Sequence, residues 1–289
     1  MASANLQQRT PAWHAARRGK LTASNLGSAL GLCPWTSRQQ AYNRAMGIER
    51  YALKRRPKNL GGWHRRPKNV PRADRFIGND ATRWGTNNEA NGILAYSAHT
   101  GNVVEPTGLH VHPHTSWLAG SPDGLIGTEG LLEVKCPYWT KRDGSRIHKE
   151  VPAHYYLQIN LCLECADREW CDFISWTPEG FKIYRVTRDK ELHEALMGQY
   201  LKFFAAMQRM AQAPPVLTDE DKKFIEETVA ESMQRHVLYH FWDKVDVADE
   251  PPAPDEYDDM SMSRKRSHSF TADQEATAKL AKFLEDGCE

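Results

Sequence analysis

The segment at residues 121–137, SPDGLIGTEGLLEVKCP, constrains the fold of this chain more than any other part of the sequence. Its glycines between residues 127 and 130 predict a turn, because glycine adopts backbone conformations that other residues avoid. The chain is therefore expected to double back, so that residues 131–135 run beside the segment that ends at Asp123. This hairpin brings the carboxylates of Asp123 and Glu133 together, although ten residues separate them along the chain.

The chemistry of the hairpin depends on the face that each side chain occupies. Because side chains alternate along a strand, Glu133 and Lys135 share one face, while Leu132 and Val134 point into an apolar layer. Two converging carboxylates are hard oxygen ligands suited to Mg²⁺, and a nearby lysine can orient or help deprotonate a water. These are the components of a phosphodiester hydrolase. The spacing alone is also typical of an ordinary solvent-exposed strand face.

The pattern of apolar residues around the hairpin predicts alternating helices and strands. Helices are expected within the first 50 residues, with start signals at Thr22 or Ser24 and at Ser37, then from Thr86 to Gly101, and at 153–164, 190–211 and 218–242. Strands are expected at 103–105, 109–112, 116–119, 131–135, 171–176 and 181–186. This order predicts an α/β or α+β fold with a mixed central sheet flanked by helices.

Charge is distributed unevenly along the chain, although the formal net charge is only +1. Residues 1–75 contain 16 Lys or Arg and two acidic residues, which favours contact with a polyanion. Nine of these cations lie between Lys54 and Arg75, in a stretch that prolines and glycines interrupt. We expect residues 51–80 to form a flexible basic insertion that contacts phosphate, with a plain solvated loop as the alternative.

Composition also limits the domain organisation and the location of the protein. Residues 1–215 are expected to form one domain, and residues 216–242 to add a helix. Residues 243–289 are expected to form a disordered acidic linker and a short terminal helix, since eight acids and three prolines between 243 and 259 cannot easily bury a core. No stretch approaches about 20 apolar residues, and six scattered cysteines suit reduced thiols, so we expect an intracellular protein without membrane insertion.

Three ordered motifs resemble those of the lambda-exonuclease, or YqaJ-type viral recombinase, family of the PD-(D/E)XK nuclease superfamily. The first is WHAARRGKLTAS at residues 13–24, which is similar to the family block W-H-x-x-R-x-G-x-x-T-A-S. The second is SPDG followed by LEVKCP at 121–137, and the third is YYLQIN at 155–160, which is similar to the Y-x-x-Q-x-Q helix. Trp84-Gly85 with Glu89 fits a fourth block, and the resemblance spans about residues 11–210.

The resemblance implies a restriction-endonuclease-like core and a metal-dependent active site. Asp123, Glu133 and the Val134 carbonyl would bind Mg²⁺, for which Mn²⁺ can substitute. Lys135 would position the attacking water, and Gln158 would lie next to the metal site. These roles rest on the resemblance and agree with the chemistry expected of the hairpin.

Glu89 has two interpretations. The resemblance implies that Glu89 helps at a second metal position, in keeping with the Trp-Gly dipeptide that precedes it. The sequence Thr86-x-x-Glu89 also fits a capping box, in which the glutamate only ties down the start of its own helix.

The resemblance further implies a pocket for the 5′-phosphate of a DNA end. Its residues would be Arg17, Ser24, Ser121 and Asn160, with Arg18 as a second candidate for the arginine. One bidentate cation with neutral donors is also what phosphate binding requires. Asn160 departs from the glutamine common in the family, and its reach is one methylene shorter.

The function implied is a Mg²⁺-dependent 5′-to-3′ exodeoxyribonuclease on linear double-stranded DNA, which releases 5′-mononucleotides and leaves 3′ single-stranded tails for phage or viral recombination. By the same resemblance, the molecule would be a homotrimer that works with a single-strand annealing protein, inside the infected host cell if viral. One alternative is an endonuclease that cuts internally. Another is a non-catalytic DNA-binding recruitment protein.

Two further clusters contain residue types that bind metals: His110, His112 and His114, and Cys162, Cys165 and Cys171 with Cys33. The histidines alternate as zinc ligands on a strand face can, but a proline interrupts the run. The cysteine spacing is similar to that of iron–sulfur nucleases related to the superfamily, but small thiols also pack well in a core. We favour a structural role for both clusters.

Overall fold

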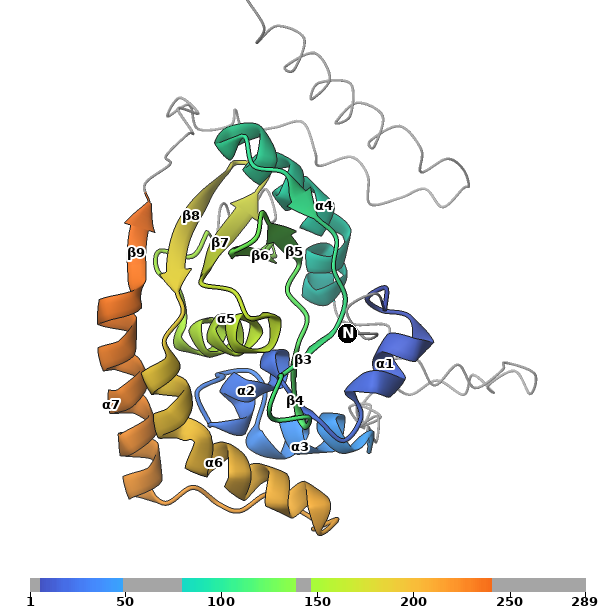
Figure 1. The fold of residues 1–289 in the computed structure, drawn as a ribbon, viewed down its shortest axis with the longest axis vertical. Coiled ribbons are helices and arrows are strands. Elements are labelled where there is room, and N and C mark those ends of the chain that lie inside the picture. Colours follow the sequence, from blue (N-terminus) through green and yellow to red (C-terminus); the bar gives the residue numbers. More distant parts are fainter. Residues whose placement is uncertain (1–5, 49–79, 139–146, 241–289) are drawn as a thin grey trace, which may run out of the picture. The chain divides into compact units, whose positions relative to one another are not determined.

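The computed structural model describes residues 6–48, 80–138 and 147–240 (Figure 1). These residues all lie within one compact unit, Met1–Asp246. The expectations for the basic insertion, apart from Asp80, and for the acidic tail concern residues outside the described ranges.

The described helices and strands follow one another in an order that mixes the two types. The helices are α1 (Pro11–Arg17), α2 (Ala23–Ala29), α3 (Arg38–Met46), α4 (Asp80–Thr100), α5 (Ala153–Ala166), α6 (Lys190–Gln208) and α7 (Asp219–His236). The strands are β1 (Leu21–Thr22), β2 (Val104–Glu105), β3 (His110–Val111), β4 (Leu118–Gly120), β5 (Gly124–Ile126), β6 (Gly130–Lys135), β7 (Trp170–Thr177), β8 (Gly180–Thr187) and β9 (Val237–His240). The six expected strands correspond to β2, β3, β4, β6, β7 and β8, with shifted ends.

The main sheet has six strands in the order β2-β5-β6-β7-β8-β9. Only β6 and β7 pair in parallel, and the other neighbours are antiparallel. A parallel pair needs a long crossover, and the connection from β6 to β7 contains α5. A second sheet has the order β1-β4-β3 and joins the N-terminal helices to the strand that leads to the hairpin. The mixed α+β fold expected from the sequence is confirmed.

Helices cover both faces of the main sheet (Figure 1). On one face, Tyr96 of α4 packs with Leu132 and Val134 of β6 in an apolar cluster. Gly92 lets α4 approach closely, because a Cβ there would lie 2.5 Å from a methyl carbon of Val134. On the other face, α5 packs in the larger core with Leu131 and the neighbouring strands. The alternation expected along residues 131–135 is therefore present, with the apolar pair directed toward α4.

The hairpin forms, but its first arm differs from the expectation. The strand that pairs with β6 is β5, which follows Asp123, whereas the segment before Asp123 contains β4 and belongs to the second sheet. The pairing register joins Gly124 to Leu132 and Ile126 to Gly130. Asp123 therefore lies at the point where the chain passes from one sheet to the other, directly beside β6.

The helix expected from Thr86 begins earlier, at Asp80, so Thr86 lies inside α4. A capping box requires its glutamate in the first turn of the helix, and Glu89 lies beyond it. The capping interpretation of Glu89 is therefore wrong. By contrast, Ser37 does begin a helix, because its hydroxyl accepts the Gln40 N–H and the Gln40 side chain accepts the Ser37 N–H.

The helix expected at 218–242 ends at His236, and the chain then continues as the strand β9. β9 pairs antiparallel with β8, which satisfies main-chain groups that a helix would have satisfied internally. The sequence Val-Leu-Tyr at 237–239 suits an extended edge strand better than a helix end. Ile225 and Val229 of α7 are buried in the larger core, so this helix is part of the same packed body.

Candidate active site

The carboxylate of Asp123 is fixed by the backbone of β6. Its backbone N–H donates to the Leu132 carbonyl at 3.0 Å, and its Oδ2 accepts the Val134 N–H at 2.7 Å. Two cross-strand bonds therefore hold the aspartate beside the end of β6. The Val134 side chain is turned away, into the apolar cluster against α4.

Glu133 is the most buried charged residue of the hairpin, with an exposed fraction of 1%. Its Oε1 accepts hydrogen bonds from Lys135 Nζ and, at 2.5 Å, from Gln158 Nε2 of α5. Its Oε2 is buried and has no hydrogen-bond partner among the described residues. A buried carboxylate oxygen without a donor is rare in folded proteins, and it offers a hard oxygen ligand to a cation.

The electrostatics of both carboxylates favour a cation. Burial, and then the charge of Glu133, raise the pKa of Asp123 well above its usual value. Burial likewise raises the pKa of Glu133, although Lys135 opposes the shift. Removing this penalty requires positive charge beyond that of one lysine.

Lys135 remains a cation in this setting. Burial alone would lower its pKa, but the charges of Glu133 and Asp123 outweigh burial and raise it. Its Nζ lies 4.8 Å from the ring centroid of Tyr155, which precedes Gln158 by three residues on α5. A protonated lysine can hold a water or stabilise negative charge, but it cannot accept a proton.

Glu89 lies on α4, within electrostatic range of the hairpin. Its charge contributes to the raised pKa of both Asp123 and Glu133. Burial, followed by the charges of Glu89 and Asp123, also raises the pKa of the Cys136 thiol to about 12. The Glu89 carboxylate forms an ion pair with Arg9.

A divalent cation fits the donor set of the hairpin. Oxygen ligands from Asp123 and Glu133 suit Mg²⁺, and the oxygen of Glu133 without a donor provides an open ligand position. In the part of the chain that the structure describes, no group of three or more His, Cys, Asp or Glu side chains is placed to hold a metal ion. Glu89, which forms the ion pair with Arg9, is a third carboxylate within electrostatic range of the hairpin.

Three of the predicted phosphate residues form a second cluster beside the hairpin, which we call the arginine cluster (Arg17, Ser24, Ser121). Arg17 Nη2 donates to Ser24 Oγ at 2.7 Å and to Thr22 Oγ1 at 3.2 Å. The Trp13 indole N–H donates to Ser121 Oγ at 3.0 Å. The Arg17 guanidinium stacks on the same indole, 4.1 Å from its centroid. Trp13 therefore connects the arginine to the serine that begins the SPDG motif.

Burial lowers the pKa of Arg17 to about 10, so it stays charged at neutral pH. Its hydrogen-bond partners are neutral hydroxyls, and it forms no ion pair with any described residue. Such a cation is available for an anion. Trp13 and Thr22 were missed as members of this cluster. The spacing of Trp13 and Arg17, four residues apart on one helix, is a signal that could have identified the stacked pair.

Two of the predicted phosphate residues lie elsewhere. Asn160 is buried, its Oδ1 accepts the Asp189 N–H at 3.0 Å, and its Nδ2 donates to the Tyr156 carbonyl at 3.2 Å. Both ends of its amide are thus used inside the protein core. The exposed Arg18 packs its side-chain stem near Gly47 at the end of α3, and does not join the cluster.

The two other candidate metal clusters are part of the packing. His112 stacks on His193 with ring centroids 5.3 Å apart, and His110 Nε2 lies 2.7 Å from the Thr107 hydroxyl. The cysteines of α5 and β7 are buried, and burial raises the pKa of the Cys162 thiol well above its usual value. These thiols are therefore neutral.

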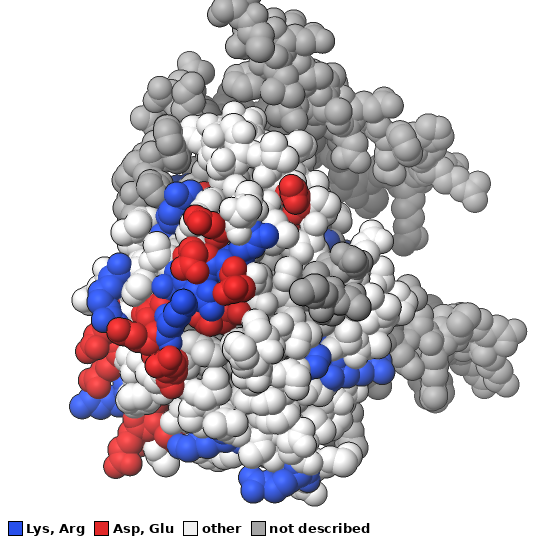
Figure 2. All heavy atoms as spheres, viewed as in Figure 1, with Lys and Arg blue, Asp and Glu red and all other residues white. Residues whose placement is uncertain are grey.

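The surface in Figure 2 shows acidic and basic side chains interleaved on this face of the described residues, with no patch of one sign. Most of the basic excess expected near the N-terminus falls between residues 50 and 75, outside the described ranges. The described surface therefore does not test that expectation. No helix of the described residues is long and apolar enough to cross a membrane.

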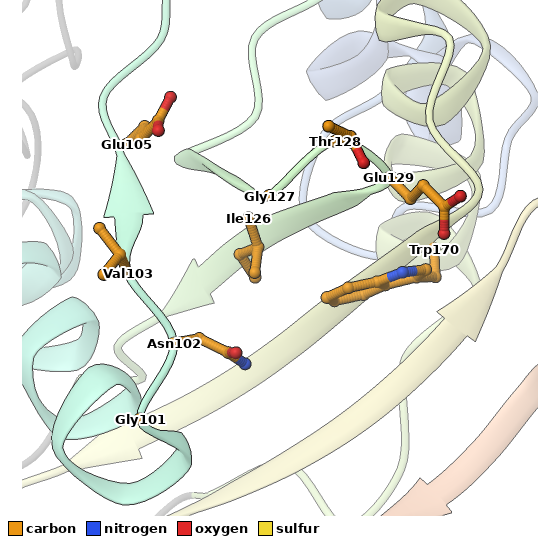
Figure 3. A pocket seen from close by; sticks show the side chains of 9 residues that line it. All are labelled: Gly101, Asn102, Val103, Glu105, Ile126, Gly127, Thr128, Glu129 and Trp170. Atoms are coloured by element: carbon orange, nitrogen blue, oxygen red, sulfur yellow. The ribbon is translucent and has the colours of Figure 1, made fainter.

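A cleft of about 460 Å³ lies at the turn of the hairpin (Figure 3). Trp170 and Glu129 line it together with Glu105 of β2. Asp123 and Lys135 lie at the other end of the paired strands, so the cleft is separate from the carboxylates. It contains none of the predicted site residues.

Comparison with solved structures gives distant similarity over most of the chain. An alkaline exonuclease from Laribacter hongkongensis is 25% identical, with a TM-score of 0.49, and the match covers 77% of this chain and 99% of that one. The same protein in complex with dAMP is 24% identical with a TM-score of 0.51 over the same shares, which shows a common fold. A phage-related exonuclease from Haemophilus somnus 129PT is 14% identical with a TM-score of 0.40, over 74% of this chain and 98% of that one.

No curated protein sequence gives a significant match. The model of the YqaJ-like viral recombinase domain matches residues 12–169, which is more than half of the chain. The matched region includes Arg17, Glu89, the whole hairpin and α5. The chain therefore belongs to the YqaJ-like viral recombinase family.

Proposed function

We propose that this protein is a Mg²⁺-dependent 5′-to-3′ exodeoxyribonuclease that digests one strand of linear double-stranded DNA. It releases 5′-mononucleotides and leaves a 3′ single-stranded tail for recombination. Membership of the family supports a nuclease that acts in recombination. The description of the structural neighbour with a TM-score of 0.51, the Laribacter hongkongensis exonuclease in complex with dAMP, agrees with this proposal.

The observation that carries the proposal is the state of Glu133. One carboxylate oxygen is held by Lys135 and Gln158, while the other is buried and has no donor among the described residues. Asp123 is clamped beside it through the Val134 N–H. This arrangement suits a divalent cation and leaves the lysine next to the same carboxylate.

Each residue of the hairpin has a distinct role in the proposed hydrolysis. When bound, a divalent cation supplies positive charge that polarises the scissile phosphate. Lys135, held as a cation, positions the attacking water and offsets developing negative charge. Gln158 orients the Glu133 carboxylate, and the β6 backbone orients Asp123. Mn²⁺ has similar ligand preferences and is expected to substitute for Mg²⁺.

The arginine cluster supports the choice of an exonuclease over an endonuclease. Arg17, Ser24 and Ser121 offer one charged fork and two hydroxyls, which match a terminal phosphate. A clamp for a 5′-phosphate is useful only at a DNA end. An enzyme that cuts internally has no need of it.

The proposal is tested by incubating the protein with Mg²⁺ and three DNA substrates. These are a linear duplex with 5′-phosphate, the same duplex with 5′-hydroxyl, and a closed circular duplex. We expect rapid release of mononucleotides from the phosphorylated linear form and none from the circle. Cutting of the circle would indicate the endonuclease, and binding without cleavage would indicate the recruitment protein.

Two sets of controls make this experiment specific. Lys135→Ala is expected to abolish mononucleotide release, whereas Lys202→Ala, which removes an exposed lysine of α6, is expected to leave it unchanged. Parallel reactions with Mn²⁺, Ca²⁺ or a chelator test the metal requirement. Activity that persists in the chelator would contradict the metal-dependent mechanism.

Two further parts of the proposal rest on the family alone. The protein is proposed to assemble as a homotrimer around DNA and to act beside a single-strand annealing protein. Analytical ultracentrifugation of the full chain tests the first part, with a monomer at all concentrations as the contradicting result. Co-purification of the full chain with a single-strand annealing protein tests the second, with no complex as the contradicting result.

A further inference from the structure

The short turn before α1 is anchored at both of its ends. The Thr10 hydroxyl donates to the Gln7 carbonyl at 2.8 Å and accepts the Trp13 N–H at 3.2 Å. The Gln8 side chain donates to the Pro122 carbonyl at 2.7 Å and to the Thr107 carbonyl at 3.3 Å. The turn is therefore tied to the helix that carries Arg17 and to the residue that precedes Asp123.

Arg9, in the middle of this turn, has an unusual backbone conformation. Its φ is 65°, in the left-handed region that favours glycine and disfavours a residue with a long side chain. The side chain is half-exposed and forms an ion pair with the Glu89 carboxylate of α4. An exposed ion pair stabilises a protein little, so folding stability does not account for an arginine at this position. Disfavoured conformations of this kind cluster at functional sites.

The partner of Arg9 is a carboxylate whose charge acts on both acidic residues of the hairpin. Glu89 adds negative charge to a group that already contains Asp123 and Glu133 and only one lysine. Arg9 offsets the charge of Glu89 directly. A divalent cation would offset the same charge, and both interactions use the oxygens of one carboxylate.

We propose that Arg9 is a positioning residue that holds Glu89 and competes with the divalent cation for it. The inference rests on the proposed function, because it assumes that the hairpin binds a metal ion. Arg9 keeps Glu89 aligned while the site is empty, and it must release the carboxylate for Glu89 to become a metal ligand. The N-terminal turn thereby sets the metal concentration at which the site fills.

The test measures Mn²⁺ binding to the full chain without DNA, by titration with detection of free Mn²⁺ by electron paramagnetic resonance. Arg9→Gly removes the cation and relieves the backbone, and Arg9→Asn removes the cation with a residue that tolerates the same conformation. Both are expected to bind Mn²⁺ about two- to fivefold more tightly than the original protein, the range set by an exposed ion pair. Arg9→Lys, which restores a cation, is expected to return the affinity close to that of the original protein.

Two controls separate this effect from a general change of charge or structure. In a Glu89→Gln background, Arg9→Gly is expected to have no further effect on Mn²⁺ affinity. Arg168→Ala removes an arginine that bonds the Gly127 carbonyl at the far end of the hairpin, and it is expected to leave the affinity unchanged.

The outcomes distinguish the inference from the function on which it rests. Equal Mn²⁺ affinity in the original protein, Arg9→Gly and Arg9→Asn would overturn the role of Arg9 while leaving the metal site intact. Absence of Mn²⁺ binding by the original protein would overturn the metal site, and the role of Arg9 with it. A tightening that persists in the Glu89→Gln background would also overturn the inference.

Discussion

Buried acidic side chains lie on or against α5 in two regions of the molecule, and the two regions differ in how completely the carboxylate oxygens are hydrogen-bonded. In the hairpin, Glu133 accepts bonds at one oxygen, while the other lacks a donor among the described residues. At the end of α5, both oxygens of Glu164 accept bonds from Arg188, at 2.7 and 2.8 Å. Asp189 nearby accepts the Leu192 N–H at 3.0 Å and the Ser232 hydroxyl at 2.6 Å.

The difference also appears in the acidity of the groups. Burial and neighbouring carboxylates raise the pKa of Asp123. Burial acts in the same direction on Asp189, but the hydrogen bonds from Ser232 and Leu192, with the charges of His236 and Arg235, outweigh it and lower its pKa. A buried acid whose bonds are complete is thus part of the scaffold. One whose bonds are incomplete is a candidate ligand position.

The largest expected effect is the loss of catalysis in the hairpin. Glu133→Gln is expected to lower the rate of mononucleotide release at least about 10³-fold, because the metal loses a charged ligand. Its metal-free unfolding free energy should stay within about 1 kcal/mol of the original protein, since Asp123 still balances Lys135. Glu164→Gln serves as the matched change in the other region. Retained activity in Glu133→Gln would contradict the comparison.

Breaking the ion pair at the end of α5 should instead cost stability. Arg188→Ala leaves the buried Glu164 without its partner, and the loss of unfolding free energy is expected to be about 3–5 kcal/mol in urea denaturation. A double change to Arg188→Met and Glu164→Leu should be much milder, because no buried charge remains. A loss of unfolding free energy below about 1 kcal/mol in Arg188→Ala would contradict a structural role for the Arg188–Glu164 ion pair.

Binding of a metal ion to the hairpin, where one Glu133 oxygen lacks a donor among the described residues, should stabilise the protein against unfolding. At a Mg²⁺ concentration one hundred times its dissociation constant, the unfolding free energy is expected to rise by about 2.7 kcal/mol. The Glu133→Gln variant should show no such rise. The Arg188→Ala variant should show the full rise when its unfolding free energies with and without Mg²⁺ are compared. Thermal unfolding with and without Mg²⁺ checks this expectation. Equal stabilisation of Glu133→Gln would place the metal elsewhere.

A substitution in the arginine cluster is expected to have a smaller effect, on the preference for a phosphorylated DNA end. Arg17→Lys keeps the charge but loses the planar fork that stacks on Trp13 and binds phosphate bidentately. The preference for a 5′-phosphorylated over a 5′-hydroxyl end is expected to fall about tenfold, or about 1.4 kcal/mol. Arg18→Lys is the matched control and should keep the preference. The ratio of initial rates on the two substrates measures it.

The smallest expected effect is on the way the unfolding free energy declines at acidic pH. Because the pKa of Asp189 is lowered by folding, its contribution is present above its unfolded value of about 3.9 and is lost as pH falls through the lower folded value. Asp189→Asn should therefore flatten the decline of stability in this acid range. Urea denaturation between pH 5 and about 2 tests the slope. An unchanged slope would mean that other acids control acid unfolding.

The sequence predicted the hairpin well because its information is local. Glycine spacing and the alternation of Glu133 with Val134 determine which groups meet, and both are readable within 17 residues, 121–137. The phosphate pocket was predicted from the resemblance, and the structure brings together three of its five predicted residues as the arginine cluster. The resemblance could not predict that Asn160 is used inside the core, because its side chain accepts the N–H of Asp189, which is distant in the sequence.

Other features lack any local signal. Arg9 meets Glu89 across 80 residues of chain, and no pattern near either residue indicates the contact. The early start of α4 and the turn from α7 into β9 depend on pairing and packing with distant elements. Tertiary contacts override local preference at such places.

The antiparallel register of β5 and β6 makes the active site depend on loop length more than on loop chemistry. Each residue added between residues 126 and 130 would advance β6 by one position and exchange its two faces. The acid and the lysine would then enter the layer under α4, and leucine and valine would face α5. A library of the turn should therefore tolerate many substitutions at residues 128 and 129, few at Gly127, whose φ is 52°, and almost no change in the number of turn residues. Insertions here would inactivate the enzyme without touching a reacting group.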